Sequence, residues 1–101
     1  MILNHIAREQ VAVSSAVITL TEATVKTANS NGEQRVVYAE IDVQDDDVYV
    51  TFDGSTDPAA DAGEKWYDKD KKRVWGIKNL TNLKFLRVTG DAVLEVNYWG
   101  R

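Results

Sequence analysis

Apolar and polar residues alternate along most of this chain, which is the pattern of β-strands that bury one face. In residues 36–43 the odd-numbered positions are apolar, whereas Tyr38, Glu40 and Asp42 lie on the opposite face. The predicted strands span residues 11–25 (one or two strands), 36–43, 48–52, 65–67, 74–77, 83–89 and 92–98. We therefore predict an all-β fold, a single antiparallel β-sandwich or barrel of about seven to eight short strands.

Clusters of turn-forming residues separate these strands and suggest how they pair. Asn31-Gly32 is a strong turn signal because both residues tolerate positive φ. The triplet Asp45–Asp47 predicts a hairpin between the strands on either side of it, and Gly90-Asp91 predicts a second hairpin. In the first hairpin, the apolar residues of both strands share the inner face.

No long segment has helical periodicity. Leu80, Leu83 and Leu86 fit either one short helical turn or the entry to a strand, and we favour strand entry after a turn at Lys78–Asn82. Residues 1–10 are predicted as an N-terminal arm or first edge strand. Residues 11–101 are predicted as a single β domain, since 101 residues suffice for one core and not for two.

The amino-acid composition argues against several classes of protein. The chain lacks cysteine, so neither disulfides nor thiolate metal sites hold the fold together. No apolar run is long enough to cross a bilayer, and the N-terminus does not resemble a secretory signal. The net charge of −4 argues against a nucleic-acid partner.

The charge is unevenly placed along the chain. Acidic residues concentrate in Asp45–Asp70, and basic residues in Lys71–Arg101. These are either two solvated surfaces or an acidic face that meets a basic face on a neighbouring subunit.

A loop of roughly twelve residues, Asp53–Glu64, is long for a compact domain, and loops of this length often carry contacts. Asp53-Gly54 turns the chain out of the preceding strand, and Pro58 stiffens the loop.

The chain offers little for catalysis, and we predict that it is not an enzyme and takes no cofactor or metal. Its one histidine, His5, lies near a terminus and is interpreted as an ordinary surface residue. Asp45–Asp47 with Asp53, Asp57 and Asp61 present either ligands for a hard cation or turn-forming side chains, and we favour turns. The acids are too numerous to indicate a glycosidase pair.

The aromatic residues are the more informative feature. The four residues concerned are Trp66, Tyr67, Trp75 and Trp99. If they are exposed together, they stack on sugar rings or anchor a protein interface; otherwise they plug the two ends of a small barrel.

Two stretches carry a family resemblance. Residues 51–63 read T-F-D-G-S-T-D-P-A-A-D-A-G, and residues 83–100 read L-K-F-L-R-V-T-G-D-A-V-L-E-V-N-Y-W-G. Together they resemble the small β-sandwich structural proteins of tailed bacteriophages. The first half fits more loosely, through V-A-V-S-S-A-V-I-T-L-T in residues 11–21. The chain departs from the pattern in its Ser-Thr-Asp-Pro sequence and in its charged segment 68–73.

The resemblance implies a virion component, assembled in the cytoplasm of a bacterial host. The implied function is that of a capsid decoration (cement) protein that binds the major capsid protein and stabilises its lattice, as an oligomer and often a trimer. The N-terminal arm and the 53–64 loop are the implied contact segments. The implied interface residues are Trp66, Tyr67, Lys71, Lys72, Arg73, Asp53, Asp57 and Pro58.

Two alternatives remain at this stage. The same resemblance fits a tail, neck or head-fibre component. A carbohydrate-binding module that uses exposed aromatic residues is the alternative from a different class.

Overall fold

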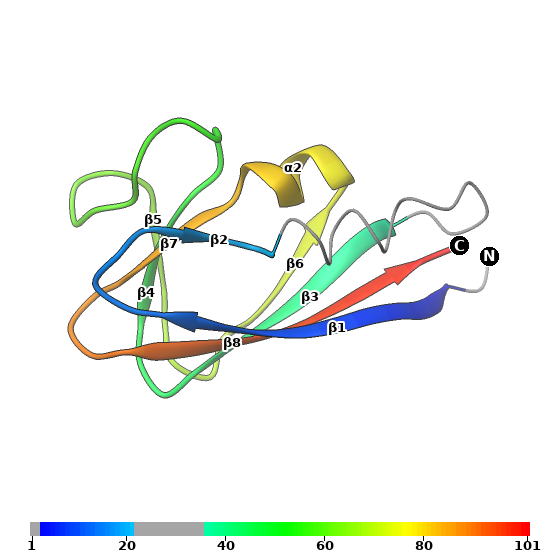
Figure 1. The fold of residues 1–101 in the computed structure, drawn as a ribbon, viewed down its shortest axis with the longest axis horizontal. Helices are drawn as coiled ribbons and strands as arrows, with labels where there is room; N and C mark the ends of the chain where they lie inside the picture. The colour runs from blue at the N-terminus through cyan, green and yellow to red at the C-terminus, as the bar shows by residue number, and fades with distance from the viewer. Residues whose placement is uncertain (1–2, 22–35) are drawn as a thin grey trace.

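The computed structural model describes residues 3–21 and 36–101. Within them the chain forms two antiparallel four-stranded sheets and one short helix, so the predicted all-β sandwich is confirmed (Figure 1). The elements are β1 (Asn4–Val13), β2 (Ile18–Thr19), β3 (Val36–Gln44), β4 (Val48–Thr51), β5 (Glu64–Trp66), β6 (Lys71–Trp75), α2 (Ile77–Asn82), β7 (Lys84–Arg87) and β8 (Ala92–Gly100).

The order of the strands is that of a jelly roll. One sheet has the order β1-β8-β3-β6 and contains the long strands, and we call it the long sheet. The other, the short sheet, has the order β2-β7-β4-β5. Strand pairs β1–β8, β2–β7, β3–β6 and β4–β5 are all antiparallel, so the chain folds back on itself as one extended hairpin that is rolled into two layers.

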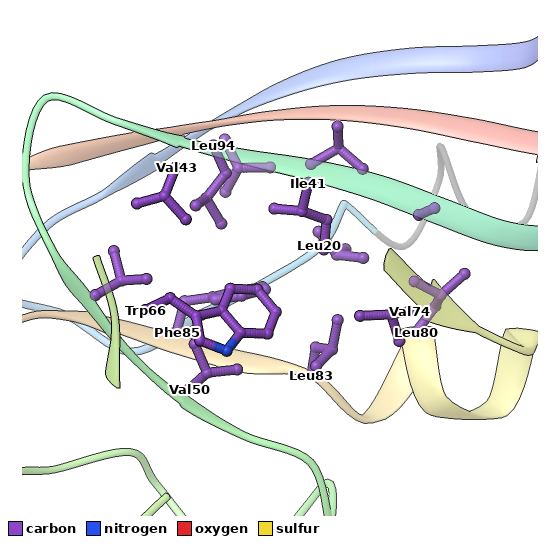
Figure 2. Packing of buried hydrophobic residues seen from close by; sticks show 14 of the residues in the cluster. Leu20, Ile41, Val43, Val50, Trp66, Val74, Leu80, Leu83, Phe85 and Leu94 are labelled. Carbon is purple, nitrogen blue, oxygen red and sulfur yellow. The ribbon is translucent and has the colours of Figure 1, made fainter. Parts of the chain in front are cut away.

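The core lies between the two sheets and is built from alternate residues of each strand. Along β8 the buried residues are every second one from Ala92 to Gly100, as the alternating pattern predicts. Figure 2 shows Ile41, Val43 and Leu94 of the long sheet facing Trp66 and Phe85 of the short sheet. Burial of these side chains stabilises the fold by about 1.5–3 kcal/mol each.

Both predicted hairpins are wrong. β3 belongs to the long sheet and β4 to the short sheet, and the same is true of β8 and β7. The segments Asp45–Asp47 and Gly90-Asp91 therefore carry the chain from one layer to the other. The predicted shared inner face is nevertheless present, because Val43 and Val48 are both buried in the one core.

Hydrogen bonds from backbone N–H groups to aspartate side chains hold these crossings together. Asp46 Oδ2 accepts the backbone N–H of Gly90 at 3.1 Å, and Asp47 Oδ1 accepts that of Asp68 at 2.8 Å. Asp45 has a φ of 76°, in the left-handed region that aspartate tolerates better than most residues. These acids form turns, which is the interpretation that the sequence favoured.

The predicted turn at Lys78–Asn82 is also wrong, because residues 77–82 form helix α2. The strand predicted after it is present as β7. Gly76, with a φ of 90°, turns the chain out of β6, and Asn79 Nδ2 donates to the carbonyl oxygen of Trp75 at 2.8 Å. Leu80 of this helix points into the core (Figure 2). A helix of six residues is too short for its periodicity to be recognised in the sequence.

Two further expectations concern the first third of the chain. β1 continues from Asn4 to Val13 at the edge of the long sheet, so residues on both sides of position 10 form one strand. Residues 22–25 of the predicted 11–25 strand region and the turn at Asn31-Gly32 lie outside the described residues. Among the described residues, no helix has the length and apolar character needed to span a membrane.

Candidate functional site

The outer face of the long sheet carries a row of four rings, one from each strand. The cross-strand partners are His5 with Trp99, Trp99 with Tyr38, and Tyr38 with Trp75. We call these four residues the aromatic row. Since neighbouring strands lie ~4.8 Å apart, the row extends ~14 Å across the sheet.

A β-bulge in β1 determines which residue joins the row. The register of β1 against β8 shifts between His5 and Ala7, so Ile6 is the extra residue. Ile6 packs against the core, and His5 lies opposite Trp99 on the outer face. Without the bulge, the strict alternation of the strand would place Ile6 outside and His5 inside.

The rings of the aromatic row contact one another in pairs. The Tyr38 and Trp75 rings are 4.6 Å apart between centroids, at an interplanar angle of 34°, and those of His5 and Trp99 are 5.2 Å apart at 77°. His5 Nε2 also lies 2.8 Å from Asn97 Oδ1, which fixes the imidazole. Trp75 is 52% exposed, an unusual state for so large an apolar side chain.

Ion pairs occupy the next two rows of the same face. Arg73 Nε lies 3.4 Å from Glu40 Oε2, and the guanidinium carbon is 5.5 Å from the centre of the Tyr38 ring. Glu95 accepts a hydrogen bond from Arg8 at 2.9 Å and another from Gln10 at 2.7 Å. Such pairs contribute at most ~1 kcal/mol each to stability, but they orient the side chains of the face.

One acid on this face is poorly paired. Asp42 lies between Glu95 on β8 and Lys71 on β6 in the strand register. Its Oδ1 atom is buried, and no described group donates a hydrogen bond to it. A carboxylate opposite a carboxylate is unfavourable across strands, so Asp42 weakens the sheet locally.

The basic triplet that the sequence singled out forms the first part of β6. Lys71 and Arg73 are exposed, and they alternate with Lys72, whose Nζ lies 6.0 Å from the centre of the Trp66 ring. The structure therefore brings Lys71 and Arg73 together with Trp75 on one strand, at the border of the aromatic row. Lys72 points to the other side of the strand.

Two of the predicted interface residues lie in the interior, so they are unsuited to contact a partner, and those two predictions are wrong. Trp66 is only 2% exposed; its ring contacts Phe85 at 5.9 Å and Phe52 at 6.1 Å between centroids (Figure 2). Pro58 is fully buried. Trp66 turns inward because it is the cross-strand partner of Val48, which also faces the core.

The loop that contains Asp53 and Asp57 is held by its own hydrogen bonds. Asp53 Oδ1 accepts the N–H groups of Ser55 (3.0 Å) and Thr56 (2.8 Å), and Oδ2 accepts the Thr56 hydroxyl at 2.5 Å. These bonds lower the pKa of Asp53 from 3.8 to about 2. Asp57 is exposed and lies 3.1 Å from Lys84 Nζ. The role of both acids as contact residues stays a prediction.

Tyr67 is 55% exposed, as an interface residue should be, but it follows β5 in the short sheet and does not join the aromatic row. The Lys65 ammonium lies 5.2 Å from the centre of its ring. In residues 3–21 and 36–101, no group of three or more His, Cys, Asp or Glu side chains is arranged to hold a metal ion.

Sequence reasoning missed Tyr38 and predicts His5 only as an ordinary surface residue. One signal was available, because Tyr38 and Trp99 stand on the polar faces of strands whose opposite faces are apolar. That all four rings form one row depends on the strand order and on the bulge in β1, which alternation does not reveal.

Comparison of the chain with protein-family models, with curated proteins and with solved structures gives no match.

Proposed function

We propose that this protein is a structural subunit of a bacteriophage virion, a capsid decoration protein that binds the major capsid protein through the outer face of the long sheet. The observation that carries this proposal is the aromatic row, with half-exposed Trp75 at its end. Aromatic residues and arginine dominate the binding energy of protein interfaces, and this face combines both.

The fold and the sequence resemblance support the same assignment. Jelly rolls build viral capsid domains, although a fold shared with many functions is support by analogy alone. Residues 51–63 and 83–100 carry the resemblance to phage structural proteins. The proposed subunit acts by adhesion and shape, and no catalytic role is assigned to it.

The size of the face suits this role. The protein measures 40 × 26 × 21 Å along its principal axes. A stable interface needs ~800 Å² from each partner, and the broad side of the sandwich can supply that area. The proposed oligomer is a trimer, as the resemblance implies, and the mass of the purified protein in solution tests this part.

The binding test uses capsids of the phage that encodes the chain, assembled without it. We expect the purified protein to sediment with these capsids saturably and to raise the temperature at which they break. Trp75→Ala should weaken binding by about 30-fold or more, the effect of losing an interface hot spot. Tyr67→Ala is the matched control, because Tyr67 is about equally exposed but does not belong to the aromatic row. Failure of the unaltered protein to bind capsids would contradict the proposal.

Labelling the protein in intact virions separates the capsid role from a tail, neck or head-fibre role. Decoration predicts many copies over the head. Label confined to one vertex or to the tail would favour the alternative location.

A carbohydrate-binding module is the second candidate, and the aromatic row favours it too. Sugar rings stack on exposed indole faces, and jelly rolls include lectin domains. Binding on a glycan array that disappears with Trp75→Ala and persists with Tyr67→Ala would establish it. Trp66→Ala is unsuitable for this purpose, since Trp66 belongs to the core.

A further inference from the structure

β6 forms one edge of the long sheet. Among the described strands it pairs with β3 alone, whereas β3 and β8 each have neighbours on both sides. An edge strand presents backbone N–H and C=O groups that another strand can pair with. The residues of β6 that carry these groups can be deduced from the register.

The hydrogen bonds at the two ends of the β3–β6 pair fix the alternation. The N–H of Val43 donates to the carbonyl of Asp70 at 2.9 Å, and the N–H of Gly76 donates to the carbonyl of Val37 at 2.8 Å. In an antiparallel pair, every second residue directs its backbone groups to the neighbouring strand. The even-numbered residues of β6 therefore face β3, and the odd-numbered residues face away from the sheet.

The odd-numbered residues of β6 are Lys71, Arg73 and Trp75. Their backbone groups point along the open edge, and their side chains stand on the outer face. The Arg73 side chain is 61% exposed, in agreement with an edge that the described residues leave open. The edge thus combines backbone donors and acceptors with two positive charges and an indole at alternate positions.

We propose that this edge takes up an extended segment of a partner protein as an additional antiparallel strand. The segment carries acidic side chains opposite Lys71 and Arg73 and an aromatic side chain opposite Trp75, in the order aromatic-x-acidic-x-acidic. Backbone hydrogen bonds supply affinity in such strand addition, and the alternate side chains supply specificity. This inference rests on the proposed function and specifies how the capsid partner is held.

A second copy of β6 does not suit this edge. An antiparallel pair of two β6 strands centred on Arg73 places arginine opposite arginine, with lysine nearby on both sides. Like charges directly opposite each other destabilise a sheet, and basic residues protect edge strands from self-pairing. The charge of the edge therefore selects an acidic strand.

A synthetic peptide, Thr-Tyr-Thr-Glu-Thr-Glu-Thr, tests the proposal with the full chain. We expect its binding to slow amide hydrogen exchange at Lys71, Arg73 and Trp75, which exchange fast in the free protein. The amides of Lys72 and Val74 should be slow in both states. The control peptide, Thr-Tyr-Thr-Lys-Thr-Lys-Thr, should not bind. Equal binding of the two peptides, or slow exchange of the Arg73 amide in the free protein, overturns the proposal.

Two variants separate the contribution of charge from that of the backbone. Arg73→Gln removes the charge and should weaken peptide binding up to about fivefold. Arg73→Pro also removes the outward N–H and should weaken binding by a further factor of up to ~10, while the bonds to β3 remain. Unchanged exchange at Val74 verifies that the variant is folded. Equal binding of these two variants overturns strand addition.

The same variants distinguish failure of this inference from failure of the proposed function. Capsid binding that is lost in Trp75→Ala but retained in Arg73→Pro would keep the decoration role and reject strand addition. Absence of capsid binding by the unaltered protein would reject the decoration role, while the peptide experiment still decides whether the edge accepts a strand.

Discussion

The Tyr98 hydroxyl on β8 donates a hydrogen bond to Oε2 of Glu9 on the neighbouring strand β1. The other carboxylate oxygen of Glu9 accepts the backbone N–H of Thr21 at 3.1 Å, just beyond β2 in the short sheet. Glu9 therefore links the edges of the two sheets through one carboxylate. Tyr98 is completely buried, so its hydroxyl depends on this partner.

Replacing Tyr98 with phenylalanine should lower the free energy of unfolding by ~1–2 kcal/mol, because Glu9 loses a donor in a partly buried position. Urea denaturation measures the change. Tyr67→Phe is the control and should change stability by less than ~0.5 kcal/mol, since Tyr67 is exposed. Equal stability of Tyr98→Phe and the unaltered protein would show that the bond contributes nothing net.

Tyr98 should also make the free energy of unfolding decrease at alkaline pH. Burial, together with the hydrogen bond to Glu9 and the negative charge of that residue, raises the pKa of Tyr98 above its ordinary value. In the unfolded chain the phenol ionises near pH 10, whereas in the folded protein it stays neutral. The stabilisation is therefore fully present below pH ~10 and is lost as the pH rises above it.

Denaturation of the unaltered protein and of Tyr98→Phe across this range isolates the effect. We expect the free energy of unfolding of the unaltered protein to fall more steeply, by up to ~1.4 kcal/mol per pH unit above pH 10. Parallel curves for the two proteins would mean that Tyr98 ionises alike in the folded and unfolded states.

Trp66→Ala should lower the stability of the protein much more than Trp75→Ala, whereas Trp75→Ala should weaken binding. Trp66→Ala leaves a cavity between the sheets and should cost ~3–5 kcal/mol of unfolding free energy. Trp75→Ala removes mainly the contact with Tyr38 and should cost ~0.5–1.5 kcal/mol. Thermal and urea unfolding measure both variants. Similar losses would contradict the assignment of Trp75 to the surface.

The alternation in the sequence predicted which residues face the core but not which sheet each strand joins. Ile41 and Val43 are buried as predicted, whereas β3 and β4 lie in different sheets. A strand that buries one face in the core has the same alternation of apolar and polar residues in either sheet. The sequence pattern therefore does not distinguish a hairpin within one sheet from a connection between the two sheets. Alternation also fails at the start of β3, where the register against β8 shifts between Val36 and Tyr38. At this irregularity Val36 is buried in place of Val37.

The candidate site could be predicted only in part, because alternation does not reveal which strands are neighbours. Consecutive strand residues point to opposite faces, so Trp66 and Tyr67 are not both exposed, and this could have been inferred. The sequence marks Trp75 and Trp99 as aromatic residues of interest, but their place in one row follows from pairing between distant parts of the chain. Local patterns contain no information on such pairing.

Asp53 should organise its loop only while it is ionised. Hydrogen bonds from Thr56 and Ser55 hold the pKa of Asp53 at about 2, below the unfolded value near 4. Its contribution to stability is therefore present above pH ~4 and lost as the pH falls towards 2. An NMR titration should show the Thr56 amide shifting with a midpoint of about 2.

The variant Asp53→Ala should accelerate amide exchange at Ser55 and Thr56 at neutral pH. Asp57→Ala is the control within the same loop and should leave these amides unchanged, because Asp57 pairs with Lys84 instead. A titration midpoint near pH 4 for the Asp53 carboxyl would contradict the hydrogen-bonded geometry.

Asp42→Thr should stabilise the protein, unlike most substitutions in a sheet. Asp42 faces Glu95 across the β3–β8 pair, and its Oδ1 atom receives no hydrogen bond from the described residues. Threonine removes the like-charge contact and has a higher preference for strands, so we expect a gain of ~0.5–1 kcal/mol in unfolding free energy. The gain should shrink at high salt, where repulsion between partly exposed charges is screened.

Glu40→Thr on the same strand face is the control and should give no gain, because it breaks the pair with Arg73. A loss of stability in Asp42→Thr would mean that the carboxylate is held favourably by Lys71 on the other side.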